Sequence, residues 1–185
     1  MIRIASYRLF ANESEWCVRA NQRCASRSVR AYFRAVSRLG DGVFWYALMM
    51  LLTAFGGMRG SIAALQLAAT GLVSLALYKV LKRWARRPRP CAADTRIMAL
   101  IAPLDEFSFP SGHTLHAVAF SCIAIAHFPW LAWVLVPFSA SVALSRVMLG
   151  LHYPSDVLAA FAIGIALGKL SLVAGNLIEI LPAGI

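Results

Sequence analysis

Five apolar stretches, each long enough or nearly long enough to cross a lipid bilayer, follow one another through most of this 185-residue chain. They cover residues 42–58, 61–81, 112–128, 130–148 and 154–174. A helix of about 18–20 apolar residues spans the hydrocarbon core and satisfies its own backbone there. Only 14% of the residues are charged, against about 25% in soluble domains. The sequence therefore predicts an all-α, polytopic integral membrane helix bundle with about five transmembrane helices.

The first forty residues are more polar, and their arginines recur at helical spacing. Such a stripe, with apolar residues largely on the other side, is typical of an amphipathic helix in the headgroup plane. We therefore expect a basic amphipathic interfacial segment over residues 1–40 and a transmembrane domain over residues 41–185. We expect this stripe to be a solvated basic face with no specific ligand, and we favour this role over specific substrate binding. Its members are Arg19, Arg23, Arg27, Arg30, Arg34 and Arg38.

The net charge of +10 indicates an anionic partner. In a soluble protein that partner would be nucleic acid, whereas beside a membrane it is anionic lipid and phosphate headgroups. We therefore expect an anionic bilayer as a partner and no nucleic acid. The four cysteines lack zinc-type or redox spacing, so we expect no metal, cofactor or disulfide. The first forty residues are also too polar to contain the apolar core of a cleavable signal peptide.

Three short polar blocks lie at the ends of the apolar stretches, at residues 82–90, 110–113 and 145–156. The first block follows the second span, the second opens the third span, and the third joins the fourth span to the fifth. Counting the crossings puts all three on the same membrane face. A random scatter would put some of them on the other face, and charge beside a bilayer needs stabilisation. The three blocks are therefore predicted to form one site.

The basic residues of these blocks suit a phosphate group. Lys82 supplies a point charge, and Arg89 and Arg146 supply planar forks that match a phosphate dianion and its transition state. Ser111 and Gly112 open an apolar stretch, where free backbone N–H groups and the helix dipole can hold phosphate oxygens. An isolated basic run beside a span would be only a topology signal, but these residues converge.

The histidines of the blocks add the chemistry that cleaves a phosphate. His152 and Asp156 share one helix face, so that the carboxylate can hold one imidazole nitrogen and leave the other free to attack. His113 is then the natural acid for the leaving oxygen. His116, one turn later, is expected to pack within its helix, and His127 falls at the opposite membrane face.

Two acidic residues precede the second block. Asp105 and Glu106 could steer a lipid headgroup or balance nearby positive charge, and we favour the balancing role, with Arg86 and Arg87 as their partners.

Taken together, the three blocks resemble the signature of the type 2 phosphatidic acid phosphatases, whose superfamily includes glucose-6-phosphatase and the vanadium-dependent haloperoxidases. No signature position departs from the pattern. Members often have six crossings, and here the N-terminal interfacial helix is expected to replace the sixth. The motifs are Lys82-x6-Arg89-Pro90, Pro110-Ser111-Gly112-His113 and Ser145-Arg146-x5-His152-x3-Asp156.

The resemblance implies a metal-independent lipid phosphatase that hydrolyses a terminal phosphate monoester or pyrophosphate of a lipid headgroup through a phosphohistidine. It implies that His152 is the nucleophile, that Asp156 orients it, and that His113 protonates the leaving group. It further implies that the phosphoryl group is held by Lys82, Arg89, Ser111, Gly112 and Arg146.

The same phosphate-binding residues, called the cage below, bear on the substrate and on the other classes of protein that could use them. Phosphatidylglycerophosphate or phosphatidic acid is the expected substrate, with undecaprenyl pyrophosphate and lipid A phosphates as alternatives. A haloperoxidase would use the cage to hold vanadate, but those enzymes are water-soluble. A non-catalytic phospholipid-binding or transport protein would have little need for a His–Asp pair aimed at the phosphate.

Sidedness can be read from the cations. Of the 18 lysines and arginines, all but Arg59 and Lys169 fall on the site side of the spans, which puts that side in the cytoplasm by the positive-inside rule. The resemblance favours the opposite side, because many bacterial relatives act on the outer face of the inner membrane. We predict a protein of the bacterial inner (plasma) membrane with a cytoplasmic-facing site, and keep the periplasmic-facing site as the alternative.

Overall fold

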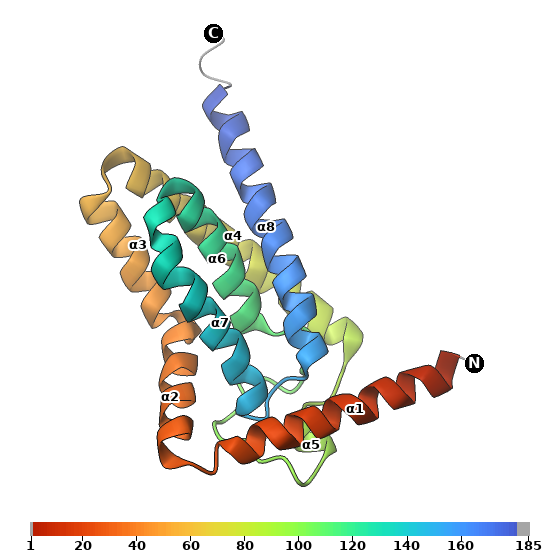
Figure 1. Cartoon of the computed structure of the whole chain (residues 1–185). Coiled ribbons are helices and arrows are strands. Elements are labelled where there is room, and N and C mark those ends of the chain that lie inside the picture. Colours follow the sequence, from red (N-terminus) through yellow and green to blue (C-terminus); the bar gives the residue numbers. More distant parts are fainter. Residues whose placement is uncertain (1, 181–185) are drawn as a thin grey trace.

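The computed structural model describes residues 2–180, with side-chain surroundings for residues 12–175 (Figure 1). Met1 and residues 181–185, which belong to the two predicted segments, lie outside the described residues. The same holds for the side chains of Arg3 and Arg8, which contribute to the charge count.

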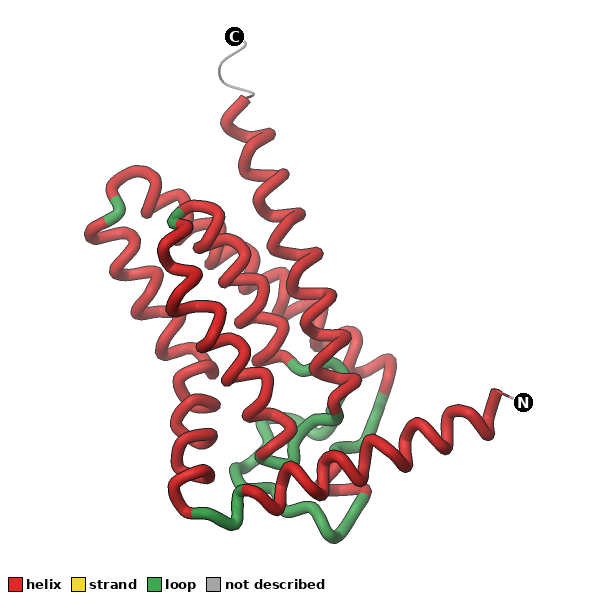
Figure 2. Tube along the Cα trace, viewed as in Figure 1, coloured by secondary structure: helices red, strands yellow, loops and turns green. Residues whose placement is uncertain are grey.

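Every element of the described chain is a helix (Figure 2). The all-helical bundle predicted from the sequence is confirmed. In chain order the elements are α1 (Ile2–Arg23), α2 (Arg27–Arg38), the π-helical turn η1 (Leu39–Val43), α3 (Phe44–Phe55), α4 (Gly57–Ala85), α5 (Pro90–Ala93), α6 (Gly112–His127), the 3₁₀ turn η2 (Pro129–Leu131), α7 (Ala132–Met148) and α8 (Pro154–Ile180).

Four helical segments of the described chain are long and apolar enough to cross a membrane: Arg27–Phe55, Gly57–Ala85, Pro129–Met148 and Pro154–Gly175. The remaining predicted span corresponds to α6, which has 16 residues. The outer faces of the long helices expose large apolar side chains, as a lipid-facing surface requires. Examples are Tyr46, Met50, Leu65, Leu72, Trp133 and Leu158.

The predicted single Arg-striped helix is wrong in one respect, because the chain breaks between α1 and α2. Ser26 has an extended backbone there, and Arg30 donates to the carbonyl oxygens of Cys24 and Ala25. These bonds satisfy carbonyl acceptors of the turn between the two helices. Beyond the break, α2 runs through η1 into α3, so the helix continues through residue 40. The division of the chain at that residue stays a prediction.

Helix α6 is the centre of the bundle and packs against α4, α7 and α8. Its contact with α8 is close because glycines of α8 face it. A Cβ atom on Gly164 would lie 2.8 Å from the carbonyl oxygen of Leu115, and one on Gly168 would lie 2.6 Å from the Cβ of Cys122. This packing fixes the start of α6 beside the start of α8, where two of the polar blocks lie.

Helix α1 crosses the lower end of the bundle in Figure 1, beside α5 and the loops of the polar blocks. Asn21 ties these segments together. Its Nδ2 donates to the carbonyl oxygens of Met98 and Met148, and its Oδ1 accepts from the backbone N–H of Met98. Helix α1 therefore ties the loop after α5 to the end of α7, next to the segments of the polar blocks.

We expect Gly164→Val to separate α6 from α8 and to cost about 1–3 kcal/mol of stability, as overpacking of a core does. The measurement is the thermal unfolding midpoint of the purified protein in detergent. Ala162→Val is the matched control, because Ala162 lies on the exposed face of the same helix. Equal midpoints for the two variants would contradict the close packing described here.

Candidate active site

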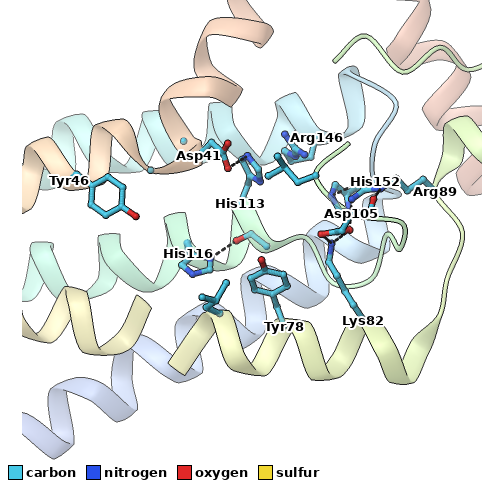
Figure 3. Close-up of a pocket in the computed structure, with 15 residues that line it drawn as sticks. Asp41, Tyr46, Tyr78, Lys82, Arg89, Asp105, His113, His116, Arg146 and His152 are labelled. Carbon is cyan, nitrogen blue, oxygen red and sulfur yellow. Dashed lines mark hydrogen bonds and ion pairs between the residues drawn. The ribbon is translucent and has the colours of Figure 1, made fainter. Parts of the chain in front are cut away.

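The three polar blocks meet in one cavity of about 190 Å³ (Figure 3). Each of the contributing elements supplies a side chain from its end nearest the loops. Lys82 comes from α4, His113 from α6 and Arg146 from α7, while Arg89 and His152 come from the loops that follow α4 and α7. The grouping predicted from the crossing count is what the fold brings together.

His152 lies between a carboxylate and a cation. Its Nδ1 is 3.7 Å from Oδ2 of Asp156 and has no hydrogen bond within the described part of the chain. Its Nε2 is 3.3 Å from a guanidinium nitrogen of Arg89. Burial, and then the charges of Arg146, Arg89 and Lys82, hold the pKa of His152 well below its ordinary value. The ring is therefore neutral at physiological pH, and a neutral ring can present a nitrogen lone pair.

Asp156 is held by contacts that the sequence did not reveal. Arg87 donates to its Oδ1 at 2.6 Å, and the backbone N–H of Tyr153 donates to its Oδ2 at 2.8 Å. Arg87 also pairs with Glu13 of α1 at 2.6 Å. Glu13 in turn accepts bonds from the backbone and the hydroxyl of Ser155 at the start of α8. Helix α1 thus reaches the carboxylate beside His152.

Asp105 lies among the phosphate-binding candidates. Its carboxylate accepts from Lys82 at 2.6 and 2.7 Å and from Arg89 at 2.7 Å. Burial alone would raise the pKa of this carboxyl, but the hydrogen bond and charge of Lys82 and the charge of Arg89 hold it below its ordinary value. The expected pairing of Asp105 with Arg86 and Arg87 is therefore wrong. Its ion pairs are instead with two cations of the site, Lys82 and Arg89, which are only 6% and 3% exposed.

Arg146 is 2% exposed and donates to the hydroxyl of Ser37 in α2. Its Nε makes no hydrogen bond within the described residues. A buried guanidinium with an unused donor can accept an anionic partner. Ser37 was missed from the sequence because it lies in the N-terminal segment, far from the polar blocks along the chain.

Ser111 and Gly112 lie at the start of α6 as predicted, but they are not equally available. The backbone N–H of Ser111 donates to the carbonyl oxygen of Asp156, and its hydroxyl shares a hydrogen bond of 3.0 Å with Thr114. Gly112 lines the cavity. The start of α6 is thus fastened to the start of α8, with Gly112 rather than the Ser111 backbone facing the cavity.

Nε2 of His113 lies 3.3 Å from Oδ1 of Asp41 in η1 (Figure 3). Asp41 was not singled out from the sequence, although the run Gly40-Asp41-Gly42 is a signal of irregular backbone just before an apolar span. His116 bonds the carbonyl oxygens of Gly112 and Gly71, which agrees with its expected packing role.

The far end of the bundle holds the remaining histidine. His127 contacts Oε1 of Gln66 at 2.7 Å and lines a separate cavity with Arg59. Its position agrees with the face that the crossing count assigned to it.

The sequence profile of the PAP2 superfamily matches residues 63–177. This match covers the three polar blocks and more than half of the chain. The fold, the site and the match together place the chain in the class of membrane lipid phosphatases. The chain belongs to the PAP2 superfamily. The family resemblance seen in the motifs is confirmed.

Two bacterial relatives illustrate the similarity. The chain is 33% identical over 126 residues to undecaprenyl-diphosphatase BcrC of Bacillus subtilis. This alignment covers 68% of this chain and 65% of that protein. The chain is 34% identical over 137 residues to decaprenylphosphoryl-5-phosphoribose phosphatase of Mycobacterium tuberculosis, which covers 73% of this chain and 72% of that protein. The first alignment thus leaves about a third of the relative unmatched.

The fold is also that of a solved structure, the transmembrane PAP2-type phosphatidylglycerolphosphate phosphatase from Bacillus subtilis. The TM-score is 0.75 at 24% identity, over 91% of this chain and 86% of that one. At this identity the likeness concerns the fold, and it confirms the transmembrane PAP2 architecture.

We expect Asp105→Asn to tighten the binding of inorganic anions, because it removes the carboxylate that occupies Lys82 and Arg89. A gain of about tenfold in vanadate affinity, worth about 1.4 kcal/mol, should appear in the inhibition constant measured with a soluble phosphate ester. The exposed neighbour Glu106 supplies the control variant, Glu106→Gln. Weaker vanadate inhibition in Asp105→Asn would show that the carboxylate supports anion binding instead of competing with it.

Proposed function

We propose that this PAP2-family lipid phosphatase removes a terminal phosphate from a membrane lipid through a covalent phosphohistidine on His152. The observation that carries the proposal is the position of His152, whose Nδ1 faces Asp156 while its Nε2 faces Arg89 and the cavity. When Asp156 closes onto Nδ1 and the substrate displaces Arg89 from Nε2, a neutral imidazole in this position has one nitrogen held and one free to attack.

In the first step, the lone pair of His152 Nε2 attacks phosphorus opposite the leaving oxygen. The P–N bond forms while the P–O bond to the lipid breaks, and the leaving oxygen takes a proton from protonated His113. The imidazole then carries positive charge. Asp156 stabilises this charge, and its contact of 3.7 Å with Nδ1 shortens to a hydrogen bond, as catalytic contacts often do on going from the free enzyme to the complex.

In the second step, neutral His113 takes a proton from water while the water oxygen attacks phosphorus. The P–N bond breaks, His152 recovers its lone pair, and inorganic phosphate leaves. His113 is again protonated and ready for the next lipid. The same residue thus serves as acid and then as base.

Charge stabilisation in both steps is assigned to Lys82, Arg89 and Arg146, with Gly112 at the start of α6. These groups are fixed before the substrate arrives, and oriented donors aimed at developing negative charge are a large source of catalysis. Three cations can balance the charge of a phosphoryl transition state, so we propose a metal-independent reaction. Ser111 acts by fastening α6 to α8 beside this cluster.

Phosphatidylglycerophosphate or phosphatidic acid is the substrate that fits the proposed cytoplasmic face, where such lipids are made. Polyprenyl diphosphate is a second candidate, favoured by the similarity of the chain to the undecaprenyl-diphosphatase of Bacillus subtilis. A panel of purified lipids, including lipid A phosphates, separates them by the rate of phosphate release. The fastest substrate decides between a glycerolipid ester and a diphosphate.

We expect His152→Ala to lower turnover at least about a thousandfold and to abolish a covalent phosphoenzyme, because no other group accepts the phosphoryl. Phosphate release and mass spectrometry of quenched enzyme measure the two effects. His127→Ala is the matched control, a histidine at the opposite end of the bundle, and should keep both. Substantial turnover of a natural lipid by folded His152→Ala protein would overturn the mechanism.

For sidedness, we expect Glu106→Cys to escape an impermeant thiol reagent in intact cells and to react after permeabilisation. Met58→Cys, exposed and beside His127 at the opposite end of the bundle, should react in intact cells. Both are made after replacement of the four native cysteines. The reverse pattern would place the catalytic face in the periplasm and would refute the assignment from the cation count.

A further inference from the structure

The helix from α2 to α3 is kinked at η1, at the level of the cavity, and Asp41 is the central residue of this turn. Gly42 has φ +133° and ψ −43°, a backbone conformation that L side chains rarely adopt. Gly40 lies so close to α7 that a Cβ atom there would be 2.8 Å from Cγ2 of Val142. Both glycines are therefore required for this path of the chain. Single π-turns inside helices are frequent at functional sites.

The turn presents Asp41 to the cavity. Its Oδ1 is 3.3 Å from Nε2 of His113, and both residues line the cavity with Arg146 (Figure 3). The Asp41 side chain is 48% exposed and that of His113 is 11% exposed. The carboxylate thus lies at the open side of the cavity and contacts the imidazole from that side.

The other charged or titratable groups around His113 explain why this contact matters. Arg146 on α7, Lys82 on α4, His152 on the loop before α8 and His116 on α6 itself act on the ring, and none of them carries negative charge. A proton on His113 is therefore opposed first by burial of the ring and then by these neighbours. Asp41 is the carboxylate in contact with the ring, and it favours the protonated form that a general acid needs.

We propose that Asp41 is the positioning residue for the general acid, holding protonated His113 through Nε2 while the second ring nitrogen serves the leaving oxygen. This inference rests on the acid role proposed above for His113. Asp41 lies outside the three polar blocks, and it also precedes the region matched by the PAP2 profile, residues 63–177. The site then has two His–Asp pairs, one for the nucleophile and one for the acid.

The experiment compares two leaving groups. Cleavage of p-nitrophenyl phosphate needs little help from an acid, whereas release of a lipid alkoxide needs a proton. Asp41→Asn should lower turnover of the faster of phosphatidic acid and phosphatidylglycerophosphate by about 10- to 100-fold, within the range of general acid catalysis. Turnover of p-nitrophenyl phosphate should fall less than about threefold, and Asp41→Glu should restore part of the lipid activity. Asp94→Asn, the same charge change outside the cavity, is the matched control.

A second comparison tests whether Asp41 acts through His113. In the His113→Ala background, Asp41→Asn should cause no further loss on the lipid. Equal losses on both substrates, or a further loss in that background, would overturn the proposal and assign Asp41 to Arg146 or to folding. If His113→Ala itself shows no dependence on the leaving group, the proposed acid role fails. If it does show one and Asp41→Asn does not, only the present inference fails.

Discussion

Three buried cations at one end of a membrane helix bundle need counter-charges and hydrogen-bond acceptors, and much of the remaining structure supplies them. Charge removed from water is costly unless hydrogen bonds and counter-charges replace the lost solvent. Asp105 provides them for Lys82 and Arg89, and Ser37 provides an acceptor for Arg146. These partners come from a loop and from the N-terminal helices. The bundle core, the loop and the N-terminal segment are thus joined by one electrostatic requirement.

The N-terminal helices contribute more to the site than their distance along the chain suggests. Glu13 of α1 holds Arg87, which holds Asp156, and Asn21 of α1 bonds the backbone of the loop after α5 and of the end of α7. Ser37 and Asp41 belong to α2 and to the turn that follows it. All four precede the region matched by the family profile. The polar blocks supply the chemical groups, and the N-terminal helices fix several of them in position.

The sequence was sufficient to place the polar blocks together because the order of apolar stretches determines on which face each block emerges. Asp105, Asp41 and Arg87 could not be assigned, since their partners depend on loop paths and helix rotation that apolar periodicity does not contain. The break between α1 and α2 was missed for a similar reason. An arginine spacing of three and four residues continues across a turn that backbone and side-chain bonds of Arg30 stabilise.

The length of α6 has a consequence for the lipid itself. Sixteen residues at a rise of about 1.5 Å each give about 24 Å, whereas the hydrocarbon core measures about 30 Å. The central helix is thus shorter than the layer that its neighbours cross, so its two ends cannot both reach the headgroup plane. Where the far end of α6 lies level with the opposite headgroup plane, the cavity at its start lies below the near one, and a phosphate meets it only if the bilayer thins locally or the headgroup sinks by several ångströms. Access to His113 and His152 would then depend on membrane thickness as well as on substrate chemistry.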